Sequence, residues 1–168
     1  MGQEIESRKD ELDRAREVCK QGLRWLIRAR VRNGWPRHVA NGTNPDIRAT
    51  SFAFNALERF SDEFEIRTPY DLPYTRLWLV EQLRDGLDCS PGTADTDTME
   101  RVAFAMSVLC RTARRTATFW LRNSIHWLLM TDAGDTKQDS QYRHALRFYG
   151  VVELLRRRDC VHILRQLL

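Results

Sequence analysis

The chain has 168 residues, of which 42% are hydrophobic and 30% are charged, and its formal net charge is +4. This apolar fraction is typical of a folded globular domain and excludes a chain that is disordered as a whole. No apolar run approaches the roughly 18 residues that a transmembrane helix needs, so no membrane span is expected.

Apolar residues recur every three or four positions along almost the whole chain, a period that predicts an all-α fold. Glycine, proline and asparagine gather between the periodic segments and favour turns there. No segment shows the sustained alternation that is typical of a half-buried strand. The expected helices are, in chain order, residues 4–32, 46–60, 72–84, 98–112, 114–131, 140–156 and 159–168.

Two of these helices have capping signals at their start. Asn44-Pro45 predicts an N-cap residue followed by a proline in the first turn, which would open the helix of 46–60. Asp97 followed by Glu100 has the spacing of a capping box and is expected to open the helix of 98–112.

The four cysteines, Cys19, Cys89, Cys110 and Cys160, are too far apart to form the paired spacing of a zinc knuckle. Cys19 and Cys110 lie in apolar helical stretches and are expected to be small core residues. The first 18 residues lack the apolar segment of a secretory signal peptide. The expected location is therefore the cytoplasm, with reduced thiols.

An internal repeat emerges when the sequence is shifted by 52 residues. SFAFNAL (51–57) then falls on AFAMSVL (103–109), and Gly34 falls on Gly86. A third, fainter unit follows at shifts of 48 and 45, which places Gly150 on Ala105. In each unit the first-helix glycine is expected to end that helix in a left-handed turn. A small residue in the second helix would let a neighbouring helix approach closely.

The repeat predicts one helical domain over residues 1–168, built from stacked helical hairpins. Its three units are expected at about 12–60, 72–112 and 114–156, followed by a C-terminal helix at 159–168. The alternative is a chance similarity between unrelated amphipathic helix pairs.

The first unit resembles a repeat of the α/α toroid found in terpene cyclases and protein prenyltransferases. In GLRWLIRARVRNGW (22–35), Trp25, Leu26, Gly34 and Trp35 match the family pattern, and Arg30 stands where the family has glutamine. The second helix of the unit, DIRATSFAFNAL (46–57), matches at Thr50, Ala53, Ala56 and Leu57. The resemblance implies about half of a toroid, with the second helices inside.

The acids and metal ligands of that family are largely absent from this chain. The Asp-rich motif of the cyclases would fall on residues 46–51, where only Asp46 and Thr50 match. Asp95-Thr96-Asp97-Thr98 looks similar, but it is expected to form a turn and an N-cap. The histidines are scattered, so no metal site and no cofactor are expected. The sequence favours a non-catalytic protein over an enzyme.

Side chains at the starts of the second helices are expected to share one mouth for a ligand or a protein. These residues are Asp46, Arg48, Asp97, Asp139 and Tyr142. The alternative is that the aspartates merely favour helix N-termini, because of the helix dipole. The tryptophans Trp25, Trp78, Trp120 and Trp127 are expected to pack in the core and the hairpins.

Three functions are compatible with these patterns. The favoured one is a module that binds a partner protein, or a second copy, through an apolar face. The second is an isoprenoid-binding protein or cyclase-like enzyme, with a deep pocket capped by Asp46, Asp97 and Asp139. The third is nucleic-acid binding, because residues 111–168 hold 11 basic and 5 acidic residues. Its contacts would include Arg111, Arg114, Arg115 and Arg122, whose helical spacing also fits a solvated face.

Overall fold

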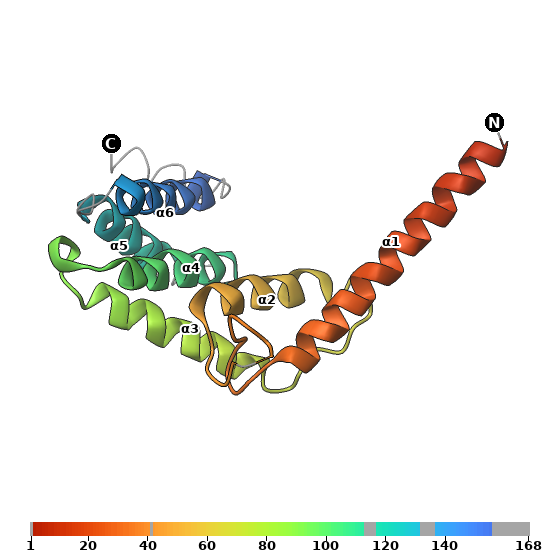
Figure 1. Ribbon diagram of the computed structural model, residues 1–168, viewed down its shortest axis with the longest axis horizontal. Coiled ribbons are helices and arrows are strands. Elements are labelled where there is room, and N and C mark those ends of the chain that lie inside the picture. Colours follow the sequence, from red (N-terminus) through yellow and green to blue (C-terminus); the bar gives the residue numbers. More distant parts are fainter. Residues whose placement is uncertain (1, 41, 113–116, 132–136, 156–168) are drawn as a thin grey trace. The chain divides into compact units, whose positions relative to one another are not determined.

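The computed structural model describes residues 2–40, 42–112, 117–131 and 137–155 (Figure 1). Within these ranges the protein is all-α, as the sequence predicts, and it has no β-strand. The helices are α1 (Gly2–Ala29), α2 (Ile47–Phe60), α3 (Leu72–Leu87), α4 (Thr96–Thr112), α5 (Ala117–Met130) and α6 (Lys137–Leu155), with a short 3-10 helix η1 (Pro91–Thr93) before α4. The helix expected at 159–168 lies outside the described residues.

The chain divides into two compact units, and the boundary in the sequence falls in the first turn of α3. The N-terminal unit covers residues 1–73 and the C-terminal unit residues 74–168. The predicted organisation into three repeated hairpins stays a prediction. None of the described helices is long and apolar enough to cross a membrane.

Two helices begin with caps that differ from the predicted ones. The N-cap of α2 is Asp46, whose side chain accepts a hydrogen bond from the Ala49 backbone N–H at 2.8 Å. Asn44 is not the cap, because the Asp46 N–H donates to the Trp35 carbonyl and holds residue 46 in an extended conformation. Asp95 caps α4 through the Thr98 N–H at 2.8 Å. The capping box at Asp97 is therefore wrong, and the turn and N-cap expected for residues 95–98 are confirmed.

The turn after α1 is fixed by Trp35, which we call the Trp35 clamp. The indole Nε1 donates to the Leu26 carbonyl at 2.6 Å, and the backbone N–H donates to Thr50 Oγ1 at 2.9 Å. The side chain is only 3% exposed. The clamp therefore ties the C-terminal end of α1 to the first turn of α2, while its polar groups stay paired in a buried place.

Arg30 fastens a third segment of the N-terminal unit to the same point. Its guanidinium lies over the Trp35 ring, 5.8 Å from the ring centre, and pairs with the Asp71 carboxylate at 2.5 Å. The Arg30 side chain is 7% exposed. The arginine that replaces the expected glutamine of the toroid pattern thus holds the chain just before α3.

Gly34 and Gly86 allow close packing and do not form left-handed turns. The expectation that these glycines end their helices in such turns is therefore wrong. Arg32, with φ of 47°, takes the left-handed conformation after α1, and Gly86 stays inside α3. A Cβ atom at Gly34 would meet the Thr50 side chain, and one at Gly86 would lie 2.7 Å from Val102 Cγ2. Each glycine thus touches the residue sixteen positions further along the chain.

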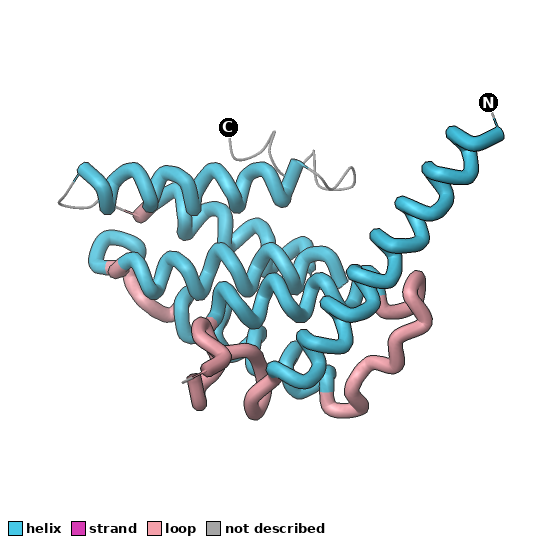
Figure 2. Tube along the Cα trace, turned by 45° about the vertical axis from the view of Figure 1, so that its right-hand side comes forward, coloured by secondary structure: helices cyan, strands magenta, loops and turns pink. Residues whose placement is uncertain are grey.

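The C-terminal unit is organised around α4. Both α5 and α6 pack against α4 and against each other (Figure 2). Every residue from Val102 to Val108 is buried, because neighbours cover more than one side of the helix. Gly150 of α6 allows the close approach that the sequence predicts, since a Cβ there would lie 3.1 Å from Leu128 and 3.2 Å from Met106.

The close contact at Gly34 gives the first testable prediction. Gly34→Ala should lower the free energy of unfolding by about 1–3 kcal/mol, because the added methyl group must displace the Thr50 and Pro45 side chains. The measurement is urea denaturation followed by circular dichroism. Gly92→Ala is the matched control, since nothing lies within 4 Å of its added Cβ. An equally small effect for both variants would contradict the role of Gly34.

Candidate functional site

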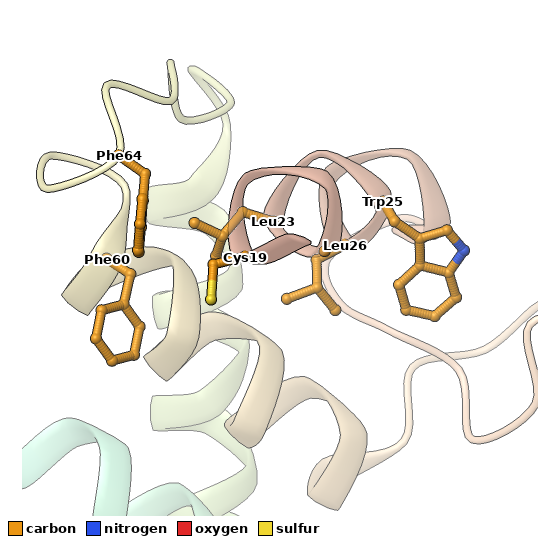
Figure 3. A pocket seen from close by; sticks show the side chains of 7 residues that line it. Cys19, Leu23, Trp25, Leu26, Phe60 and Phe64 are labelled. Atoms are coloured by element: carbon orange, nitrogen blue, oxygen red, sulfur yellow. The ribbon is translucent and has the colours of Figure 1, made fainter. Parts of the chain in front are cut away.

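An apolar pocket of about 420 Å³ lies in the N-terminal unit, between the C-terminal half of α1 and the end of α2 (Figure 3). Phe60 and Phe64 stand at one end of it, and Trp25 stands at the other. The volume is within the range of small-molecule and peptide side-chain pockets. The residues that line it are Cys19, Gly22, Leu23, Trp25, Leu26, Phe60 and Phe64.

Two predictions about α1 fail at this pocket. Trp25 was expected in the core but is 54% exposed. Cys19, expected to be a small core residue, is a free and exposed thiol. The reason is that little of the N-terminal unit packs on α1 apart from the clamp and the end of α2. The same expectations are confirmed for Trp127 and Cys110, which are buried.

The predicted mouth residues of the C-terminal unit lie where the N-terminal ends of α4 and α6 meet. Thr96 Oγ1 donates to Asp139 Oδ1 at 2.6 Å, and the Tyr142 hydroxyl donates to Glu100 Oε1 at 2.5 Å. Asp97 is exposed in the first turn of α4 and is next to Thr96. These contacts join α4 to α6, so Asp139 and Tyr142 have a structural role that the sequence did not indicate.

Arg143 completes this junction, and it was not among the residues predicted for the site. Its Nε atom lies 3.0 Å from Asp139 Oδ2, and its Nη1 atom donates to the Ala94 carbonyl at 3.0 Å. The side chain is 12% exposed. The four-residue spacing from Asp139 to Arg143 is a helical ion-pair signal that the sequence contains.

The remaining predicted residues lie apart from the apolar pocket. Asp46 is the N-cap of α2 and Arg48 is half-buried in its first turn. Neither lines the pocket, and nor do Asp97 and Asp139. Asp46, Asp97 and Asp139 all occur at or near helix N-termini, which confirms the placement that the helix dipole favours.

Of the four arginines proposed for nucleic-acid contacts, only Arg122 has a described side chain. Arg122 is exposed on α5. Arg114 and Arg115 lie outside the described residues, and so does the side chain of Arg111. Across the described part of the chain, no three His, Cys, Asp or Glu residues are grouped closely enough to hold a metal ion.

Among the described residues, Asp95 has a clearly perturbed ionisation. The Thr98 hydroxyl and the Thr98 backbone N–H donate to the carboxylate and hold the pKa of Asp95 below its ordinary value. Arg101 and Arg143 add smaller effects in the same direction. The perturbation follows from the helix cap, and Asp95 is not a pocket residue.

Comparison with known proteins finds no matching family model, no matching curated protein and no matching solved structure. The resemblance to toroid repeats therefore stays a prediction that depends on residues 22–57.

The sequence contains only weak signals for the pocket. Phe60 ends the periodic segment of α2, and Phe64 lies in the turn that follows. Nothing in their spacing indicates that they would face α1. The position of α1, fixed by the Trp35 clamp, brings them together.

The junction of α4 and α6 gives a second prediction. Arg143→Met should lower the free energy of unfolding by about 1–2 kcal/mol, because it leaves the half-buried Asp139 carboxylate without its cation. Arg84→Met is the control, since Arg84 is 64% exposed and its pairing with Asp85 spans 3.9 Å. Thermal unfolding of both variants would measure the difference. Equal losses of stability in the two variants would contradict the role of Arg143 at the junction.

The cap of α4 gives a pH-dependent prediction. Because the folded-state pKa of Asp95 is lowered, its ionised form stabilises the fold at neutral pH, and this contribution is lost as the pH falls below about 4. Asp95→Asn keeps a cap but removes the charge. The variant should therefore be slightly less stable than the native chain at pH 7 and should approach it towards pH 3. Urea titrations at both pH values would measure this, and a constant difference would contradict it.

Proposed function

We propose that this protein is a non-catalytic helical module that binds a partner protein through the apolar pocket of its N-terminal unit. The observation that carries the proposal is the exposure of Trp25 at the edge of that pocket. Tryptophan is among the residues that most often dominate binding energy at protein interfaces. An exposed tryptophan beside an apolar hollow is costly for a soluble protein unless something covers it.

The chemistry of the pocket supports binding over catalysis. Aliphatic and aromatic side chains form its walls, and the Cys19 thiol is the sole titratable group among them. General acid–base catalysis needs a positioned group that transfers a proton to or from the substrate. No carboxylate or imidazole is among the lining residues to do so.

The partner that fits best is an amphipathic helix or turn with apolar side chains at its contact face. Such a segment would place one or two side chains between Trp25 and the Phe60–Phe64 end of the pocket (Figure 3). The equivalent contacts of Gly34 with Thr50 and of Gly86 with Val102, separated by the 52-residue shift, support a helical-repeat architecture for this module.

An apolar small molecule, such as an isoprenoid, is the second candidate. The observation that favours it is the size of the pocket together with its apolar walls. The acids expected from the sequence to cap such a pocket do not line it; these are Asp46, Asp97 and Asp139. This candidate therefore needs binding without the predicted acidic cap.

Site-specific photo-cross-linking tests the proposal. A benzophenone amino acid at Trp25 should form one predominant protein adduct in the native cell, identifiable by mass spectrometry. With the partner in hand, Phe60→Ala should weaken its binding roughly 30-fold, as expected for an interface anchor. The matched control is Phe148→Ala on α6, which is 70% exposed but outside the pocket and should leave binding unchanged.

Two outcomes would contradict the proposal. One is an adduct whose binding responds equally to Phe60→Ala and Phe148→Ala. The other is saturable, one-to-one quenching of tryptophan fluorescence by an isoprenoid alcohol, abolished by Phe60→Ala, with no protein adduct at Trp25. That result would favour the small-molecule candidate.

A further inference from the structure

The first half of α1 forms an arm that the rest of the N-terminal unit leaves uncovered. The arm is defined as residues 4–18. Every side chain from Glu6 to Val18 is exposed, including Leu12 at 59% and Val18 at 67%. No other element of this unit runs along it in Figures 1 and 2. An isolated helix of this length is marginal in water, so a second helix that covers one of its faces would stabilise it.

The apolar residues of the arm follow the seven-residue spacing of a coiled coil. Ile5, Leu12 and Cys19, just beyond the arm, are seven positions apart, and Ala15 follows Leu12 by three. These are the a and d positions of a heptad. Arg8 occupies the other d position, so the seam is short and only partly apolar. Apolar burial alone would not select a particular partner for such a seam.

The charges beside the seam select a particular partner for it. Glu4 and Glu11 occupy g positions, and Lys9 and Arg16 occupy e positions. In a parallel pair, each g residue faces the e residue five positions later on the other helix. A second copy in register would therefore place Glu4 opposite Lys9 and Glu11 opposite Arg16, once on each side of the seam.

Other arrangements of the same two helices are less favourable. In an antiparallel pair g positions face g positions, so glutamates would meet glutamates and cations would meet cations. Among the described side chains of α1, Glu17 and Arg24 form an ion pair with a distance of 3.9 Å. Both of these residues lie at f positions, on the helix face opposite the seam, so this pair does not compete with contacts across it.

We infer that the arm binds the arm of a second copy of this chain in a parallel, in-register helix pair. Charge complementarity sets the partner and the orientation, and Leu12 and Ala15 supply the apolar contact. The seam is short, so the dimer is expected to be weak and to dissociate as salt screens the charges. The seam ends at Cys19, which also lines the pocket, but Leu12 and Ala15 lie outside the pocket. The arm can therefore be tested separately from the Phe60 end of the pocket.

Sedimentation velocity of the full chain at low ionic strength, over a range of concentration, tests the inference. The native chain should show a monomer–dimer equilibrium. E4K/E11K gives both sides of the seam a positive charge, and K9E/R16E gives both sides a negative charge. Each variant alone should dimerise at least about tenfold more weakly. An equimolar mixture of the two should recover the native affinity as a heterodimer, which also shows that both variants are folded.

The matched control makes the same charge change away from the seam. E6K/D13K reverses two exposed acids at b positions of the arm and should leave the equilibrium unchanged. Phe60→Ala should also dimerise like the native chain, so the arm and the pocket can fail separately. The inference is overturned by a native chain that stays monomeric at all concentrations. It is also overturned by a dimer that neither charge reversal weakens, because an antiparallel pair or another face would then hold it.

Discussion

The N-terminal unit depends on the buried clamp at Trp35. One residue satisfies hydrogen bonds from three places: the Leu26 carbonyl at the end of α1, the Asp46 N–H before α2, and the Thr50 hydroxyl inside α2. Buried polar groups that are fully paired allow few alternative arrangements, because each broken bond leaves a desolvated group. The clamp therefore fixes the connection between the end of α1 and the start of α2, and this connection creates the pocket beside Phe60.

The same constraint explains why half of α1 is left uncovered. The clamp and the end of α2 engage the last turns of α1, from about Cys19 onward. On the N-terminal side of that point, every side chain from Glu6 to Val18 is exposed. The N-terminal unit thus has two surfaces of different character. The pocket is apolar and aromatic, whereas the arm carries opposite charges on either side of a narrow apolar seam.

The C-terminal unit is held together differently, by a helix that its neighbours surround. The run of buried residues from Val102 to Val108 includes Ser107, whose hydroxyl is satisfied by the Phe104 carbonyl within the same helix. A helix buried on several sides gives little amphipathic signal, since apolar residues fill most of its circumference. The polar contacts that join α6 to the beginning of α4 lie at the junction of the helix starts and involve Asp139 and Arg143.

The sequence by itself determined the all-α class, the approximate position of each described helix, and the close approach of helices at Gly150. These properties follow from local periodicity and side-chain size, which are written directly in the order of residues. The tertiary structure decided which residue caps a helix and which aromatic side chains are buried. Asp46, and not Asn44, is the cap because the Asp46 N–H donates to the carbonyl of Trp35, eleven residues earlier in the chain. Trp25 stayed exposed because no neighbour reached its face of α1. Both outcomes depend on contacts between segments that are far apart in the sequence, and local patterns contain no information on those distances.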